Sequence, residues 1–453
     1  MTLTNDNSLL EGSLFRKILL FAFPLMLTNI LQLMYNAADM MVVGQWSGPE
    51  ALAAVSSTGS VTALMVNFFC GLAVGANVIL SRYIGAESHE DISETVHTAI
   101  AMSTILGVVL TLASLFFIDP LLHAMSCPDD VLPLASVYLK IYFFGSPAIL
   151  IYNYGANILR TEGDTKSPLY FLIVSGFVNV VLNVVLVAIF HLDTVGVAVA
   201  TIVSQYISAV LVVITLLRRT SSTRLYFSRL RIHRSKLGGM LYFGIPASFQ
   251  SLMFSVSNVL IQSAVNSFGT VAVAGSGAAS NIDSIIYGMM NAFVQAALIY
   301  TGYCVGAKQY RKIKNVAVSC LELILVAWFV STFFILIFKE PLLKIFIPDT
   351  PEALPYAYQR LEYLAYPYCL CAIMETMASL LRGLGKSIMP MIITLIGVCI
   401  MRIAWIYFIL PLNRSLGFLY LSYPVTWIIT SSVLFVCFVF VYKEKLKGAQ
   451  NEN

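Results

Sequence analysis

The chain alternates between long apolar runs and short polar connections. Twelve runs are long enough to cross ~30 Å of hydrocarbon as helices. Their approximate ranges are 17–43, 52–80, 95–118, 131–158, 168–190, 195–217, 238–265, 271–303, 316–338, 354–383, 388–410 and 416–441. The pattern predicts an all-α integral membrane protein with twelve transmembrane helices.

Composition supports this prediction and excludes a soluble protein. The 453 residues are 58% hydrophobic and 11% charged, whereas soluble domains carry about 25% charge. No short apolar segment with a small-residue cleavage site precedes the first run, so we expect no cleavable signal peptide. We interpret the eight cysteines, scattered mostly within the runs, as small apolar core residues.

The basic residues indicate how the chain is oriented. With the N-terminus placed in the cytoplasm, 21 of the 27 Lys and Arg residues fall in cytoplasmic segments and three in outer loops. Cytoplasmic loops of membrane proteins are enriched in Lys and Arg. We therefore expect a multi-pass protein of the cell (cytoplasmic) membrane with both termini in the cytoplasm.

The chain repeats itself after about half its length. Pro24 matches Pro246 at a spacing of 222 residues, and Gly163 matches Gly385 at the same spacing. Each unit holds six spans, an even number, so both units enter the bilayer in the same direction as a parallel repeat. We predict two pseudo-symmetric six-helix lobes, at residues 1–217 and 238–453.

A basic cytoplasmic linker, residues 218–237, joins the two predicted lobes. Leu, Phe and Ile side chains alternate with arginines along it. One interpretation is a polar segment held on the cytoplasmic leaflet by anionic membrane lipids. The other is a hinge helix that lets the two halves rock.

Asp39 is the single formal charge in the apolar run 18–43. A carboxylate in hydrocarbon is costly, so it normally pairs, protonates, binds a cation or faces water. Pro24 lies fifteen residues upstream in the same predicted helix, where it removes a backbone hydrogen bond and favours a bend. A titratable group beyond a helix bend is typical of an ion-driven gate.

Other polar residues are predicted at the depth of Asp39. A helix rises ~1.5 Å per residue, which places Asn183 and Thr201 at similar levels in the outer half of the membrane. Asn179 lies one turn from Asn183, and Tyr35 one turn from Asp39. These oxygens suit a hard cation or a protonation network. Alternatively, the asparagines and Thr201 only form hydrogen bonds between helices.

The second half carries different charges. Ile261 occupies the position equivalent to Asp39, while Asp283, Glu375 and Arg402 fall within later spans. Deep charges usually pair, so one interpretation is a salt bridge from Arg402 to Glu375 or Asp283. A second protonation or substrate site is the alternative.

Motifs for other functions are lacking in the sequence. It contains no HExxH, GxSxG, P-loop or GxGxxG in a credible context. An ATP-driven pump is therefore disfavoured, and an intramembrane enzyme lacks a nucleophile–base or metal pattern. We expect no catalysis, no cofactor, no structural metal site and no nucleic-acid partner.

Four stretches resemble the multidrug and toxic compound extrusion (MATE) family, and the resemblance extends over essentially the whole chain. They are PLMLTNILQLMYNAADMMVVGQWSGPEALAAV, LRTEGDTKSPLYFLIVSGFVNVVLNVV, GVAVATIVSQ and LRGLGKSIMPMIITLIGVCIMRIAW. The resemblance implies an antiporter that exports amphipathic, often cationic, compounds in exchange for H+ or Na+. A small-molecule organic substrate, a coupling ion and membrane lipids would then be its partners, and we expect a monomer.

The resemblance also implies roles for particular residues. The acid of the first helix, here Asp39, would bind the coupling ion, and Pro24 would be where that helix bends. Tyr35, Asn179 and Thr201 match further residues of that site.

The chain departs from this pattern at Asn183. Relatives often carry an aspartate there, four residues after the asparagine that matches Asn179 in the fifth apolar run, whereas this chain has an amide. With one carboxylate, a proton carrier is the simpler prediction. Na+ could still bind through Asp39, Asn179, Asn183 and Thr201.

The alternative function is a flippase for lipids or lipid-linked oligosaccharides, from the same superfamily. Such relatives favour fourteen spans and a cationic cavity. Twelve spans and few deep cations in this sequence favour the antiporter.

Overall fold

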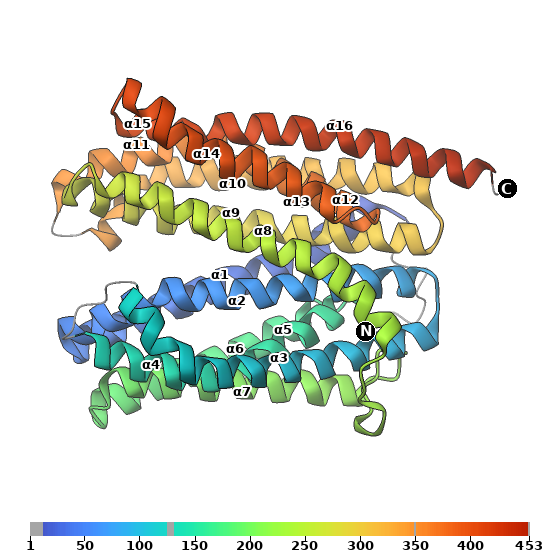
Figure 1. The fold of residues 1–453 in the computed structure, drawn as a ribbon, viewed down its shortest axis with the longest axis horizontal. Helices are drawn as coiled ribbons and strands as arrows, with labels where there is room; N and C mark the ends of the chain where they lie inside the picture. The colour runs from blue at the N-terminus through green and yellow to red at the C-terminus, as the bar shows by residue number, and fades with distance from the viewer. Residues whose placement is uncertain (1–11, 125–130, 348–349, 452–453) are drawn as a thin grey trace. The chain divides into compact units, whose positions relative to one another are not determined.

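The computed structural model describes residues 12–124, 131–347 and 350–451, and these ranges contain helices and connections but no β-strand (Figure 1). The α-helices are α1 (Leu14–Trp46), α2 (Gly48–Gly85), α3 (His89–Ala124), α4 (Leu132–Phe144), α5 (Ser146–Thr161), α6 (Lys166–Asn183), α7 (Asp193–Arg218), α8 (Arg234–Asn266), α9 (Thr270–Gly306), α10 (Tyr310–Phe346), α11 (Leu354–Ala365), α12 (Tyr368–Gly383), α13 (Ile388–Thr394), α14 (Met401–Ala404), α15 (Leu416–Tyr420) and α16 (Ser422–Asn451).

Shorter elements interrupt or extend these helices. They are the π-helices η2 (Val184–Ile189), η5 (Leu395–Ile400) and η6 (Trp405–Ile409), and the 3-10 helices η3 (Phe227–Arg229), η4 (Pro351–Ala353) and η7 (Leu410–Leu412). A π-turn shifts the helical phase, which turns the residues beyond it to a different face.

The predicted membrane spans are confirmed. Ten helical segments of the described chain are long and apolar enough to cross a membrane, and two bent pairs bring the number to twelve. The first pair, α4 and α5, bends by 46°, and the second, η4–α11 with α12, bends by 43°. Proline at the start of α5 and directly before α12 explains the breaks, because it cannot donate the helical hydrogen bond.

The internal repeat extends to details of the backbone. The helix order from α1 to α7 recurs from α8 to α16, with α13 to η6 in the place of α6 and η2. Gly163 and Gly385 both adopt positive φ, at 94° and 102°. Glu87 and Lys308 do the same in the loops after α2 and α9, at 55° and 54°. The two halves therefore share one fold in the same order.

Contacts divide the chain into two compact units. Unit 1 comprises residues 1–26, 85–87 and 249–453, and unit 2 comprises residues 27–84 and 88–248. The divisions within α1 and α8 each fall two residues beyond the proline of that helix, Pro24 or Pro246. Each of these two helices thus contributes to both units. The lobe boundaries predicted from the repeat stay a prediction, because compactness and repetition are different properties.

The linker is not a helix. Apart from the short η3, residues 219–233 have no helical structure, so the hinge-helix interpretation is wrong. Leu225 is 1% exposed, and its N–H donates to the Leu216 carbonyl at 3.1 Å. Arg219 forms ion pairs with Asp164 and Glu162 of unit 2. The linker is therefore anchored where it begins.

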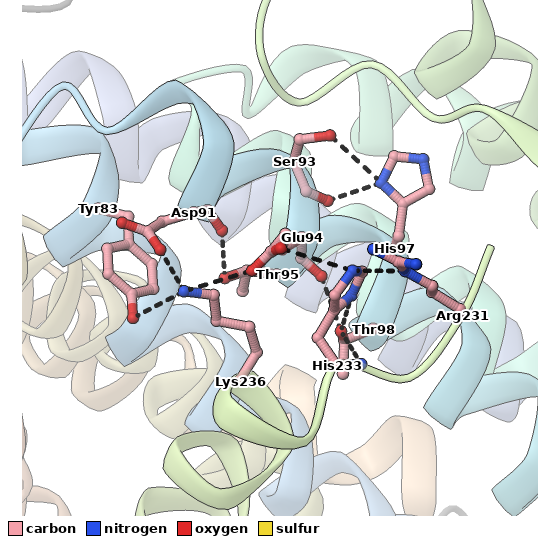
Figure 2. Close-up of polar contacts among 10 residues, drawn as sticks. All are labelled: Tyr83, Asp91, Ser93, Glu94, Thr95, His97, Thr98, Arg231, His233 and Lys236. Atoms are coloured by element: carbon pink, nitrogen blue, oxygen red, sulfur yellow. Dashed lines mark hydrogen bonds and ion pairs between the residues drawn. The ribbon is translucent and has the colours of Figure 1, made fainter. Parts of the chain in front are cut away.

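A polar cluster anchors the other end of the linker to α3 (Figure 2). Figure 2 shows Lys236 directed toward Asp91 and Glu94 of α3 and the Tyr83 hydroxyl of α2. The Lys236 Nζ to Glu94 Oε2 distance is 3.6 Å. His233 N–H donates to Thr98 Oγ1 at 3.1 Å. The start of α8 is thereby fixed within unit 2.

Tyr226 forms a third anchor, on His97. The His97 Nδ1 lies 2.6 Å from the Ser93 carbonyl oxygen, so this nitrogen carries the hydrogen and donates it. Nε2 of the same ring accepts from the Tyr226 N–H at 3.0 Å, and the two rings stack with planes 7° apart. The linker backbone is therefore held by a buried side chain of α3.

Lys236→Met tests this anchoring. It removes the cation that compensates Asp91 and Glu94, and hydrogen bonds to charged groups contribute about 1.5–3 kcal/mol each. We expect a lower unfolding temperature and several-fold faster tryptic cleavage between residues 219 and 234. The control is Lys166→Met, which removes an exposed lysine of unit 2. Equal cleavage rates in the two variants would contradict the anchoring.

Candidate functional site

Asp39 of α1 and Asn183 of α6 meet within unit 2. The Asn183 amide donates from Nδ2 to Asp39 Oδ1 at 2.5 Å. Asn183 is 0% exposed. The sequence placed these two residues at the same depth on different helices, and the structure joins them directly.

Asn179 extends this contact by one turn of α6. Asn183 Nδ2 also donates to Asn179 Oδ1, at 3.2 Å. The spacing of four residues puts both amides on one helical face. Asn183 is the last residue of α6, and the π-helix η2 begins directly after it. The site therefore lies where the helical phase changes.

One acceptor in this cluster lacks a donor. Asn183 Oδ1 is buried, and no donor among the described residues reaches it. A buried acceptor without a partner costs about 1–3 kcal/mol. A proton on a neighbouring group or a bound cation would satisfy such an oxygen. The arrangement is thus suited to changing its charge by binding H+ or a small cation.

Tyr35 packs against α6 at Gly176. A Cβ added at Gly176 would lie 1.9 Å from the Tyr35 ring, so glycine is needed for this close approach. Tyr35 is one turn before Asp39 on α1. The contact fixes the spacing of α1 and α6 next to the carboxylate.

Thr201 is not joined to the cluster by any hydrogen bond within the described chain. Its Oγ1 is buried without a partner, while its carbonyl oxygen accepts from Ser204 at 2.7 Å. The role predicted for Thr201 stays a prediction.

Two tyrosines near Asp39 were missed in the sequence. Tyr138 and Tyr142 of α4 interact electrostatically with the Asp39 carboxylate. Their rings stack with centroids 6.2 Å apart. The sequence does show two tyrosines one turn apart within an apolar run. This spacing does not indicate which neighbouring helix their rings contact.

The charged residues of unit 1 pair differently from the prediction. Arg360 Nε donates to Asp283 Oδ2 at 3.0 Å, and its Nη1 donates to Ser276 Oγ at 3.0 Å. The expected pairing of Arg402 with Asp283 or Glu375 is wrong, because Asp283 is paired with Arg360 of α11. Arg402 instead donates from Nε to Thr426 Oγ1 at 3.4 Å.

Glu375 lies near a different arginine. Arg382 interacts electrostatically with Glu375 and donates a 2.5 Å hydrogen bond to Gln250 Oε1. The described residues contain no cluster of three or more His, Cys, Asp or Glu side chains able to hold a metal. Seven cysteines are free thiols, and Cys127 lies outside the described residues.

The apolar helices and their two-fold repeated order define a multi-pass membrane protein. The MatE family model matches the chain twice, over residues 24–185 and 246–408. The two matches start 222 residues apart, at Pro24 and Pro246. The chain belongs to the MatE family, which confirms the resemblance stated above.

Curated relatives are similar over most of their length. The chain is 28% identical to "Probable multidrug resistance protein YoeA" of Bacillus subtilis, covering 96% of both chains. It is 25% identical to the "FAD transporter" of Shewanella oneidensis, covering 86% of both.

Solved structures share the fold. A structure described as "Crystal structure of MATE in the bent conformation" superposes with a TM-score of 0.89 at 23% identity, covering 99% of both chains. An outward-facing multidrug resistance MATE family transporter has a TM-score of 0.91 at 23% identity, covering 98% of this chain and 99% of the other.

Gly176→Ala tests the packing beside Asp39. The added methyl group cannot fit without displacing the Tyr35 ring, so we expect reduced transport by protein that is produced at the normal level. Gly59→Ala is the matched control, because nothing lies within 4 Å of a Cβ at this helical position of unit 2. Efflux assays on both variants should separate them, and equal activity would rule out a role for the Tyr35–Gly176 contact.

Proposed function

We propose that the protein exports amphipathic organic compounds across the cytoplasmic membrane in exchange for an inward-moving ion that binds at Asp39. The observation that carries this proposal is the part-buried contact of Asp39 with Asn183, beside a buried amide oxygen without a donor among the described residues. Several relatives are named as multidrug resistance or multidrug export proteins, which supports drug-like substrates.

We propose H+ as the coupling ion. Asp39 is the carboxylate of this cluster, and the position four residues after Asn179 carries an amide, Asn183, instead of a second acid. One of the neutral oxygens, Asn179 Oδ1, already accepts from Asn183. A hard cation prefers several charged or free oxygens, whereas one proton needs only the carboxylate.

Protonation would change the energy of unit 2 directly. An ionised carboxylate away from water is costly, and a bound proton removes that cost. Each elementary charge moved through 100 mV releases about 2.3 kcal/mol. That energy would drive export of the organic compound against its gradient. Both termini would lie in the cytoplasm, and a single chain would be the working unit.

Asp39→Asn is the first test. The amide keeps the shape of the side chain but cannot carry a proton, so we expect efflux of a fluorescent cationic dye from liposomes to lose its dependence on an H+ gradient. Glu90→Gln, at an exposed acid of unit 2, is the control and should behave as wild type. Proton-driven efflux that persists in Asp39→Asn would overturn the assigned role.

Asn183→Asp tests why this chain would use protons. A second carboxylate beside Asp39 raises affinity for a hard cation. We expect efflux that responds to a Na+ gradient at several-fold lower Na+ concentration than in wild type.

The double variant Asp39→Asn with Asn183→Asp is the matched control, since it keeps one carboxylate at the site. It should lose the added Na+ response. An unchanged Na+ response in Asn183→Asp, with transport intact, would contradict the argument from carboxylate number.

A further inference from the structure

Arg402 is a buried cation in the interior of unit 1. It lies in α14, a single turn between the π-helices η5 and η6, and is 3% exposed. A buried arginine is costly unless its charge is compensated and its donors are satisfied. Its surroundings therefore need an explanation.

The other two buried arginines of unit 1 have compensating neighbours. Arg360 pairs with Asp283 at 3.0 Å, and Arg382 lies near Glu375 and bonds Gln250. No acid among the described residues lies within ion-pair distance of Arg402. The groups that act on its charge are tyrosine and cysteine side chains.

Aromatic rings surround this guanidinium. Its Cζ lies 4.1 Å from the centroid of the Tyr423 ring and 5.8 Å from that of Trp427. Tyr368 packs edge-on against Trp427, with ring centroids 5.4 Å apart. Aromatic faces attract a cation but accept few of its hydrogen bonds.

Most of the hydrogen-bonding capacity of Arg402 remains unused within the described chain. A guanidinium has five N–H donors in a planar fork that matches a carboxylate or phosphate. The contact found is the 3.4 Å bond from Nε to Thr426 Oγ1, a long one. A ligand with two acceptor oxygens would use donors that this one bond leaves over.

The internal repeat relates the position of Arg402 to the Asp39 cluster of unit 2. The residue 222 positions after Asn179 is Met401, directly before Arg402. In unit 2 this part of the repeat lies beside the acid Asp39, whereas Ile261 takes the place of that acid in unit 1. Equivalent segments of the two halves thus carry a negative charge in unit 2, at Asp39, and a positive charge in unit 1, at Arg402.

We propose that unit 1 binds the anionic group of an organic compound at Arg402, with the aromatic part of the compound against Tyr423 and Trp427. The guanidinium fork would hold a carboxylate or phosphate in two hydrogen bonds. The inference rests on the proposed function and adds to its substrates a class of flat aromatic compounds that bear an anionic group, zwitterions included.

Equilibrium binding tests this site without any ion gradient. The probes are 2-naphthoate and its neutral amide, 2-naphthamide, titrated calorimetrically into the full-length protein in a non-ionic detergent, with empty micelles as the blank. We expect wild type to bind naphthoate about tenfold or more tightly than the amide, as a charge-assisted pair implies. Equal affinity for the two probes in wild type would overturn the proposal without any variant.

Variants assign the preference to Arg402. Arg402→Gln should bind both probes about equally, and Arg402→Lys should keep part of the preference because the charge remains. Arg414→Gln removes an exposed arginine of unit 1 and should leave the preference unchanged. A full preference for naphthoate in a folded Arg402→Gln variant would overturn the assignment.

Two further measurements separate the anion site from the ion coupling, and a lipid anion from a soluble one. Asp39→Asn should keep the naphthoate preference, so a failure of the proposed ion coupling is distinguishable from a failure of the anion site. Displacement of bound naphthoate by phosphatidylglycerol would support the site with a lipid headgroup as its anion. Retention of naphthoate would support it with a soluble organic anion.

Discussion

The cost of a charge away from water governs the interior of this protein. An apolar helix bundle offers few partners, so each buried charge must find a compensating group or be neutralised. Asp283 and Arg360 compensate each other's charge as a buried ion pair. Asp39 accepts a hydrogen bond from the Asn183 amide. Arg402 lies against the Tyr423 ring and donates to the Thr426 hydroxyl. Neither Asp39 nor Arg402 has an ion-pair partner among the described residues, so a bound ion or ligand can compensate either charge.

Duplication preserved the fold but not this chemistry. Loop conformations recur within a few degrees at Gly163 and Gly385, because both must reverse the chain with positive φ. The buried side chains differ between the two halves, although the helices follow in the same order. Ile261 stands at the position equivalent to Asp39, and Arg402 lies one residue from the position equivalent to Asn179. Two lobes with one architecture can thus serve an ion and an organic compound separately.

The spans, the repeat and the depth of Asp39 and Asn183 could be predicted, because apolar length and helical rise are local properties. The partner of Asp283 could not, since pairing depends on which faces of α9 and α11 meet. The neighbours Tyr138 and Tyr142 were missed for the same reason. The π-helices shift the helical phase without a clear signal in the sequence. Likewise, the linker pattern left a hinge helix and a lipid-held polar segment as alternatives, whereas part-buried contacts with α3 hold the linker in a non-helical conformation.

The anchored linker and the division between the two units lie at different places in the chain. Arg219, Tyr226 and Lys236 fix the linker and the start of α8 within unit 2. The division between units falls instead just beyond Pro24 in α1 and Pro246 in α8. Proline removes one helical hydrogen bond, so a helix bends there at the lowest cost. Asp39 lies on the part of α1 that belongs to unit 2. Asp39 and the proline next to the division between the two units therefore lie on the same helix.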